Sequence, residues 1–117
     1  LIAQGMAQIS GAAFPFISPL IGMLGSFATG SNSNSNVLFG PMQKSVALVL
    51  GIDAPVLLAG QTAGGSIGSM IAPTKLVVGC STTGLMGQDG LVLRKTIPVG
   101  IALGILAGVV MLALVYL

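Results

Sequence analysis

Long apolar stretches alternate along the chain with two short interruptions that are polar but uncharged. Residues 1–43 and 97–117 contain no charged side chain at all. A membrane-spanning helix needs about 20 predominantly apolar residues, and a surface helix of a soluble protein rarely runs that far without a polar face. The pattern therefore predicts an all-α integral membrane protein with about four to five transmembrane segments.

Prolines and polar runs set the expected boundaries of these segments. Pro15 and Pro19 each remove a helical hydrogen bond, so the first segment is expected to be kinked or re-entrant. The second polar break is expected over residues 61–69. The predicted elements are a kinked or re-entrant helix over residues 1–25, a polar break over 26–36 and a helix over 37–50. They are followed by a helix over 54–69 that runs into the second polar break, a further helix over 70–86 and the last transmembrane helix over 91–117.

Two local signals add detail to this outline. Asp53 followed by Pro55 is typical of a helix N-cap with proline in the first turn. Gly100, Gly104 and Gly108 recur every four residues in the last span. This spacing is the small-xxx-small pattern of close helix packing in membranes, so we expect a structural role for the three glycines and no chemistry.

Composition agrees with a membrane protein and excludes several functions. The chain is 54% hydrophobic and 5% charged, with a mean hydropathy of +1.05 and a net charge of +2. No basic run is present that could neutralise nucleic-acid phosphates, so we expect no nucleic-acid partner. The chain has no histidine and a single cysteine, Cys80. We therefore expect neither an enzyme constellation nor a metal or cofactor site.

The two uncharged breaks are the best candidates for a ligand site. Paired interruptions of membrane helices point to a transporter's substrate site. A helix that begins inside the membrane has free backbone N–H groups and a positive dipole end, which bind a carboxylate without a fixed charge. Ser and Asn side chains add further donors. The alternative, that residues 31–36 are an ordinary loop, remains open, because Ser, Asn and Gly are common in loops.

Three ordered motifs resemble the lactate permease family. Residues 29–39 read TGSNSNSNVLF and resemble the family motif T-G-S-[ND]-T-x-S-N, an apolar pair and Phe. Residues 61–73 resemble [NQ]-T-x-G-G-x-x-G-x-M-I-x-P, and residues 83–87 match T-G-L-x-G. Ser33 replaces the usual Thr and keeps the hydroxyl. Lys75 stands where an uncharged polar residue is expected.

This resemblance implies a function and a site. Family members transport L-lactate, and also D-lactate and glycolate, together with a proton across the bacterial inner membrane, and the breaks resemble re-entrant hairpin tips of a wider transporter superfamily. The chain would be the C-terminal part of a membrane transport domain in a larger polytopic transporter, with the lipid bilayer and the rest of that transporter as its partners. The expected substrate-binding residues are Ser31, Asn32, Ser33, Ser35, Asn36, Gln61, Thr62, Gly64, Gly65 and Lys75.

Proton coupling requires a group that titrates near neutral pH. The only acids are Asp53 and Asp89, and both lie in turn-like sequence. We therefore expect the coupling group to lie outside this chain, on its N-terminal side. Lys44 and Lys75 are candidate functional cations within the apolar region, unless their side chains extend to an interface.

Two other functions remain open. One is a permease for a different organic acid on a related scaffold. A dicarboxylate should require additional cationic ligands, which the breaks lack. The other is a membrane module without transport activity that packs through its glycine stripes. That module predicts no functional effect of substitutions at Asn32 or Asn36.

Overall fold

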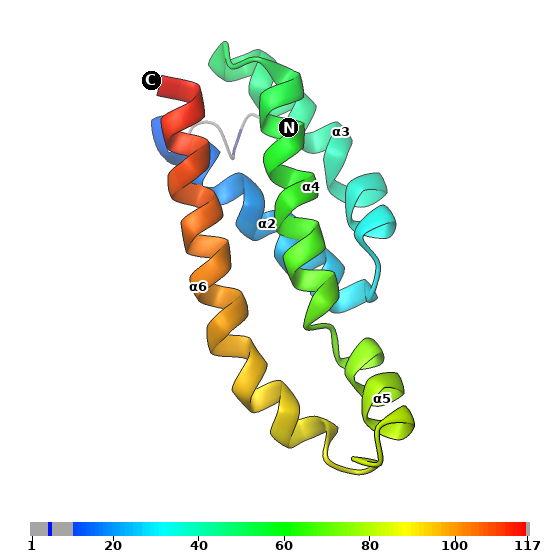
Figure 1. Ribbon diagram of the computed structural model, residues 1–117. Coiled ribbons are helices and arrows are strands. Elements are labelled where there is room, and N and C mark those ends of the chain that lie inside the picture. Colours follow the sequence, from blue (N-terminus) through cyan, green and yellow to red (C-terminus); the bar gives the residue numbers. More distant parts are fainter. Residues whose placement is uncertain (1–4, 6–10, 117) are drawn as a thin grey trace.

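The computed structural model describes residue 5 and residues 11–116, and the secondary structure of this part consists of helices and turns (Figure 1). Most of residues 1–10, expected to begin the first segment, and Leu117 lie outside the described residues. The described elements are a 3₁₀ turn η1 and five α-helices, with bounds Gly11–Ala13 (η1), Phe14–Thr29 (α2), Asn32–Leu50 (α3), Ala54–Met70 (α4), Pro73–Thr82 (α5) and Asp89–Tyr116 (α6).

The first polar run is helical over most of its length, which corrects the break expected over residues 26–36. α2 continues to Thr29, and α3 already begins at Asn32. The turn consists of Gly30, which has a φ of 74° and donates its N–H to the Ser26 carbonyl at 2.7 Å, and Ser31. The Ser31 side chain accepts a hydrogen bond from the Asn34 N–H at 3.2 Å. Ser and Asn are therefore common here because they cap α3 and form its first turns.

The second polar run contains no break, so the expectation for residues 61–69 is wrong. α4 continues without interruption from Ala54 to Met70. Its glycines bring it into close contact with α2. A Cβ atom at Gly64 would lie 1.8 Å from the Pro19 carbonyl oxygen, and one at Gly68 would lie 2.0 Å from that of Met23. These glycines are four residues apart, which is a helix-packing pattern.

The chain breaks instead just after this run, at Ile71 and Ala72. Ala72 is the N-cap of α5, with Pro73 in the first turn. α5 ends at Thr82, earlier than the expected residue 86, and α6 begins at Asp89. At the start of α4, Pro55 lies in the first turn as predicted. Asp53 occupies the N-cap position, but its side chain makes no capping hydrogen bond.

α2 is the central helix of the bundle. It contacts α3, α4 and α6, whereas α5 extends away from the bundle and returns through a turn to α6 (Figure 1). A small hydrophobic core of Phe14, Val46, Ala47, Leu57 and Met111 holds the end opposite this turn. The glycine stripe of α6 is buried as predicted: Gly100 packs against Ile71, Gly104 against Leu20 and Met23, and Gly108 against Phe16.

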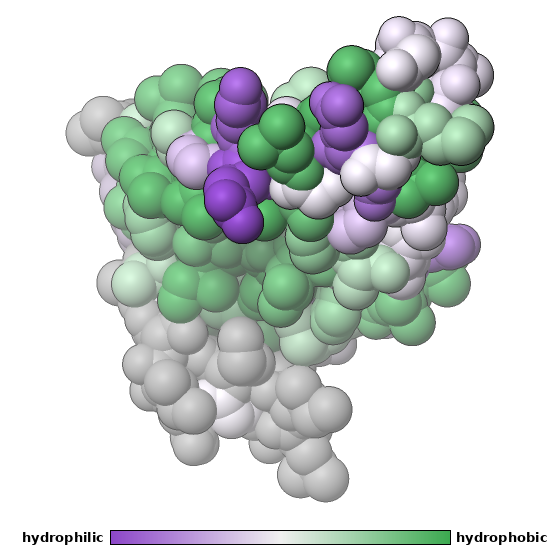
Figure 2. Space-filling model, turned by 90° about the horizontal axis from the view of Figure 1, so that it is seen from below, coloured by the Kyte–Doolittle hydropathy of each residue, from purple (hydrophilic) through white to green (hydrophobic). Residues whose placement is uncertain are grey.

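The outer surface is largely apolar. Seen from the end that carries the α5–α6 turn, hydrophobic residues cover most of the described surface and the hydrophilic ones gather toward one edge (Figure 2). Large side chains of α6 such as Ile105, Leu106 and Val109 are exposed. Within the described residues α6, with 28 residues, is the helix long and apolar enough to cross a membrane, and α2 is a shorter apolar helix.

Candidate functional site

Two helix N-termini meet at the turn between α2 and α3. We call residues 29–32 the hairpin tip. A Cβ atom at Gly30 would lie 2.3 Å from Thr74 Oγ1, so the hairpin tip lies against the first turn of α5. α3 begins at the tip itself. Helix N-termini carry unpaired backbone N–H groups and a partial positive charge. Two of them therefore face the same small region of the molecule.

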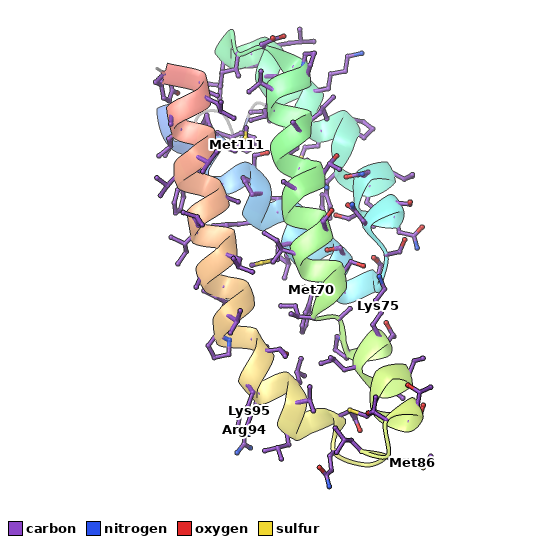
Figure 3. The ribbon with its side chains drawn as sticks, viewed as in Figure 1. Met70, Lys75, Met86, Arg94, Lys95 and Met111 are labelled. Atoms are coloured by element: carbon purple, nitrogen blue, oxygen red, sulfur yellow. The ribbon has the colours of Figure 1, made fainter. Side chains whose placement is uncertain are left out.

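Side chains from α3, α4 and α5 join these N-termini. Asn32 Nδ2 donates a hydrogen bond to Ser66 Oγ of α4 at 3.0 Å. Lys75 Nζ, in the first turn of α5, donates to Ser69 Oγ near the end of α4. Figure 3 shows Lys75 beside the hairpin tip, whereas Arg94 and Lys95 lie farther along, near the start of α6. The region thus combines a cation, hydroxyl groups and a side-chain amide.

Asn32 has an unused acceptor. Its Oδ1 atom is buried and has no hydrogen-bond partner among the described residues. It lies against α4, where a Cβ atom at Gly65 would be only 2.0 Å from it. A glycine at position 65 is therefore required for Asn32 to reach α4.

A chain of buried, uncharged side chains continues from the tip into the bundle. We call Ser18, Ser35, Asn36, Gln43 and Gln61 the polar network. Ser18, Ser35 and Gln43 are fully buried, and Gln61 is 1% exposed. They connect α4 to α2 and α3, the two helices of the hairpin. In a membrane, such groups must satisfy one another because no water is available to do so.

Gln61 is the centre of the polar network. Its Nε2 atom donates to Ser35 Oγ at 3.0 Å and to Asn36 Oδ1 at 3.3 Å. Its Oε1 atom accepts from Gln43 Nε2. Ser35 in turn donates to the Gly22 carbonyl oxygen at 2.9 Å. Every hydrogen-bonding atom of the Gln61 side chain is therefore engaged.

Gln43 connects the network to α2. Its Nε2 atom also donates to the Ser18 carbonyl oxygen at 3.1 Å, and its Oε1 atom accepts from the Ser18 hydroxyl. The same hydroxyl lies 3.0 Å from the Leu57 carbonyl oxygen. Because a hydroxyl has one hydrogen, it serves one of these two acceptors at a time.

Side-chain contacts bring together five of the ten predicted site residues. Ser35, Asn36 and Gln61 meet in the polar network, and Asn32 meets Gly65. Ser31 caps α3, and Lys75 reaches Ser69. The side chains of Ser31 and Lys75 therefore contact residues outside the predicted set. Ser33 and Thr62 are exposed on their helices, and Gly64 packs against the α2 backbone.

Sequence reasoning missed Ser18, Gln43 and Thr74. A signal existed for Gln43, because it is a lone amide within the apolar part of α3, and polar residues inside a membrane segment are functional or paired. Ser66 and Ser69 lie in the predicted second polar break, but they are not among the expected substrate-binding residues. Thr74 could not be recognised from the sequence, because the structure places the chain break at Ile71 and Ala72 and not within residues 61–69.

The arrangement is suited to binding a small anion. Backbone N–H groups, the Asn32 amide and Lys75 are donors, and no acidic side chain is among the contacts at the tip. Asp53 instead lines a cavity of about 350 Å³ with the last turn of α6. Asp89 begins α6, beyond the α5–α6 turn. The acids of the chain therefore lie away from this cluster of donors.

Comparison with known proteins identifies similar sequences. The model of the L-lactate permease family matches residues 1–117. An L-lactate permease from Bacillus subtilis is 42% identical over 89 residues, covering 76% of this chain and 16% of that protein. The glycolate permease GlcA from Escherichia coli is 36% identical over 107 residues, covering 92% and 19%.

A putative L-lactate permease from Haemophilus influenzae is 38% identical over 115 residues, covering 98% of this chain and 22% of that protein. The chain thus spans about a fifth of the length of the curated relatives that it matches. No solved structure matches it.

Proposed function

Because the chain belongs to the L-lactate permease family, we propose that it forms part of a secondary transporter that moves a small monocarboxylate across the bacterial inner membrane together with a proton. The relatives are named for L-lactate and for glycolate. Both compounds carry a carboxylate and a hydroxyl group on neighbouring carbon atoms. The proposed substrate is therefore a small 2-hydroxy monocarboxylate, with L-lactate first.

The proposed binding site for the carboxylate is the region between the hairpin tip and the start of α5. The observation that carries this proposal is the contact of Gly30 with Thr74, which places two helix N-termini side by side. Both ends favour an anion. Lys75 and the Asn32 amide supply charge-assisted hydrogen bonds, which are stronger than neutral ones. Asn36, whose Nδ2 donates to no described residue, supplies a further donor.

The hairpin of α2 and α3 is proposed to enter the membrane and return on the same side. Gly100, which packs against Ile71 near the hairpin tip, lies more than two turns into α6. α6 therefore extends past the tip, toward Arg94 and Lys95 (Figure 3). Helix breaks inside a membrane are tolerated where they line a binding site. The remaining spans and the lipid contacts of the transporter complete this arrangement.

The proton-coupling group is proposed to lie elsewhere in the transporter. Of the two acids, Asp53 is exposed beside a cavity at the opposite end of α4 from Ser69, and Asp89 begins α6. Neither contacts the hairpin tip. In this proposal the chain supplies substrate binding, and the longer protein supplies coupling.

The proposal is tested in a chimera, in which this chain replaces the matching part of the Bacillus subtilis L-lactate permease. Labelled L-lactate uptake into vesicles is measured with unlabelled L-lactate, glycolate and succinate as competitors. We expect saturable uptake that L-lactate and glycolate inhibit and succinate does not. A chimera that inserts at normal level but takes up no lactate would contradict the proposal, and so would inhibition by succinate equal to that by lactate.

The two other functions make different predictions in the same assay. In the chimera, Asn32→Ala should raise the KM for L-lactate, because it removes a donor at the hairpin tip. A packing module predicts an unchanged KM for this variant. A permease for a dicarboxylate predicts that succinate competes better than lactate.

A further inference from the structure

We propose that Gln43 sets the direction of the Asn36 side chain, so that Asn36 offers the substrate a hydrogen-bond donor and not an acceptor. This inference rests on the proposed function. Gln43 is fully buried, is not among the contacts of the hairpin tip, and acts through Gln61. It is therefore a positioning residue.

The argument starts from a property of amide side chains. The two ends of a Gln or Asn amide have nearly the same shape, but one end donates and the other accepts. Only the surrounding partners decide which end points where. A backbone carbonyl can accept but never donate. A carbonyl beside an amide therefore fixes its direction.

Such a carbonyl determines the direction of Gln43. Its Nε2 atom lies 3.1 Å from the Ser18 carbonyl oxygen, and its Oε1 atom faces the Ser18 hydroxyl. Turning the amide around would place two acceptor oxygens opposite each other. The second hydrogen on Nε2 consequently points to Gln61 Oε1.

A second carbonyl of α2 imposes the same direction on Gln61. The Ser35 hydroxyl donates its one hydrogen to the Gly22 carbonyl oxygen at 2.9 Å. While it does so, Ser35 can only accept from Gln61, whose Nε2 lies 3.0 Å away. Ser18 and Gly22 both belong to α2, so one rigid helix orients the central amide from two sides.

We call the series of hydrogen bonds from Gln43 through Gln61 to Asn36 the relay, and Asn36 is its outer end. Gln61 Nε2 donates to Asn36 Oδ1 at 3.3 Å, so the acceptor of Asn36 is used inside the bundle. Its Nδ2 group makes no hydrogen bond within the described part of the chain, and the side chain is half-buried. Asn36 lies one turn beyond Asn32 on the same face of α3. A carboxylate, which only accepts, is the complementary ligand.

Burial makes the relay effective. Ser18, Gln43 and Ser35 are inaccessible, so water cannot pair with an amide that turns the wrong way. An unpaired polar atom in such a place is costly, and bonds within a buried chain strengthen one another. The amide direction that the α2 carbonyl groups impose on Gln43 and Gln61 therefore also fixes the amide direction of Asn36.

The test is Gln43→Glu in the chimera. An ionised carboxylate at position 43 cannot donate to Gln61, so Gln61 turns to donate to it. The Ser35 hydroxyl then turns from the Gly22 carbonyl oxygen to donate to Gln61 Oε1, and Asn36 turns its acceptor toward the substrate. Competition by L-lactate and by neutral lactamide against labelled lactate gives the ratio of their affinities. We expect the preference for lactate to fall about tenfold, the factor contributed by one hydrogen bond to a charged group. An unchanged ratio in this variant and in the uncharged double variant described below would overturn the proposal.

The ratio separates positioning from general damage, because misfolding lowers the amount of active transporter without changing which ligand it prefers. The matched control is Gln88→Glu, the same change at an exposed turn residue, which should keep the ratio of the parent. A carboxyl group buried at position 43 can take up a proton and then donate to Gln61 again. The uncharged double variant Gln43→Met with Ser35→Ala is therefore measured as well, because it removes both anchors of Gln61. Its preference for lactate should fall at least twofold, and an unchanged ratio would again refute the relay.

The proposed function fails separately. A loss of lactate affinity in Asn36→Ala, together with an unchanged ratio in Gln43→Glu and in the double variant, would refute the relay and leave the binding site standing. Unchanged lactate affinity in Asn36→Ala would refute the role of Asn36 as a ligand, and with it the relay.

Discussion

Gly30 at the turn between α2 and α3 lies directly against Thr74 in the first turn of α5: a Cβ atom on Gly30 would come within 2.3 Å of Thr74 Oγ1. This contact joins segments that are 44 positions apart in the chain. It brings the N-terminus of α3 next to that of α5, and the proposed carboxylate site depends on it.

The first prediction concerns this contact. Gly30→Ala should lower the lactate uptake rate of the chimera strongly, because the added methyl group would push Thr74 and α5 away. Gly84→Ala is the control, since Gly84 also has a positive φ, 79° against 74°, but has no neighbouring atom within 4 Å. Both substitutions carry a similar backbone strain of about 1 kcal/mol. Equal losses of uptake in the two variants would mean that the contact with Thr74 is irrelevant.

A second prediction tests the packing of α2 on α4. Gly64→Ala should destabilise the protein by about 1–3 kcal/mol, because overpacking forces the two helices apart. Gly79→Ala, within α5, should be neutral or slightly stabilising, since nothing lies within 4 Å of its Cβ position and Ala favours a helix. Thermal unfolding of the purified chimeras, followed by fluorescence-detected size exclusion, gives the comparison. A Gly64→Ala variant as stable as the parent would be incompatible with the close contact.

The sequence foretold the helical membrane character and the packing role of the α6 glycines, because both depend on local composition and period. It also pointed to Ser35, Asn36 and Gln61. The second break was misplaced because Gly64 and Gly68 pack α4 against α2. A glycine-rich sequence is found both in helix breaks and in helix-packing stripes, so composition alone does not distinguish them.

The sequence could not reveal the pairing of Gln43 with Ser18 or of Gly30 with Thr74. Each pair joins helices that are distant in the chain, and no local pattern encodes their approach. Polar residues that face one another inside a bundle become recognisable only when the helix faces are known. The run of alternating Ser and Asn likewise contains both buried and exposed positions, and helix geometry separates them.

The third prediction separates two serines of that run. Ser35→Ala should destabilise the chimera by about 1–3 kcal/mol, because it leaves the buried Gln61 Nε2 with one partner fewer. Ser33→Ala should have little effect on stability, since Ser33 is exposed and its side chain makes no hydrogen bond within the described structure. The melting temperature should be lower for Ser35→Ala than for Ser33→Ala, and equal melting temperatures would argue against the polar network.

The fourth prediction compares two lysines. Lys75→Met should raise the KM for L-lactate about fivefold, less than for a buried charge because Lys75 is exposed and partly screened. Lys44→Met, exposed on α3, should leave the KM unchanged. Uptake kinetics at low ionic strength would show the difference most clearly, because salt weakens exposed electrostatic interactions. A larger effect at Lys44 than at Lys75 would move the site away from the hairpin tip.

The fifth prediction concerns coupling. Asp53→Asn in the chimera should retain lactate uptake that is driven by a pH gradient, because Asp53 lies far along α4 from Ser69 and makes no contact at the hairpin tip. Lactate-induced alkalinisation of a weakly buffered vesicle suspension measures this coupling. Uptake of lactate without alkalinisation in Asp53→Asn would identify Asp53 as the coupling group.

The central claim is that the hairpin tip and the first turns of α3 bind the carboxylate, and two asparagines of α3 test it most directly. Asn36 is half-buried and faces Gln61, whereas Asn34 is exposed and its side chain makes no hydrogen bond among the described residues. Counterflow of labelled L-lactate in the chimera should show a KM raised about tenfold in Asn36→Ala, the loss of one charge-assisted hydrogen bond, and an unchanged KM in Asn34→Ala. Unchanged counterflow in both variants would contradict the claim.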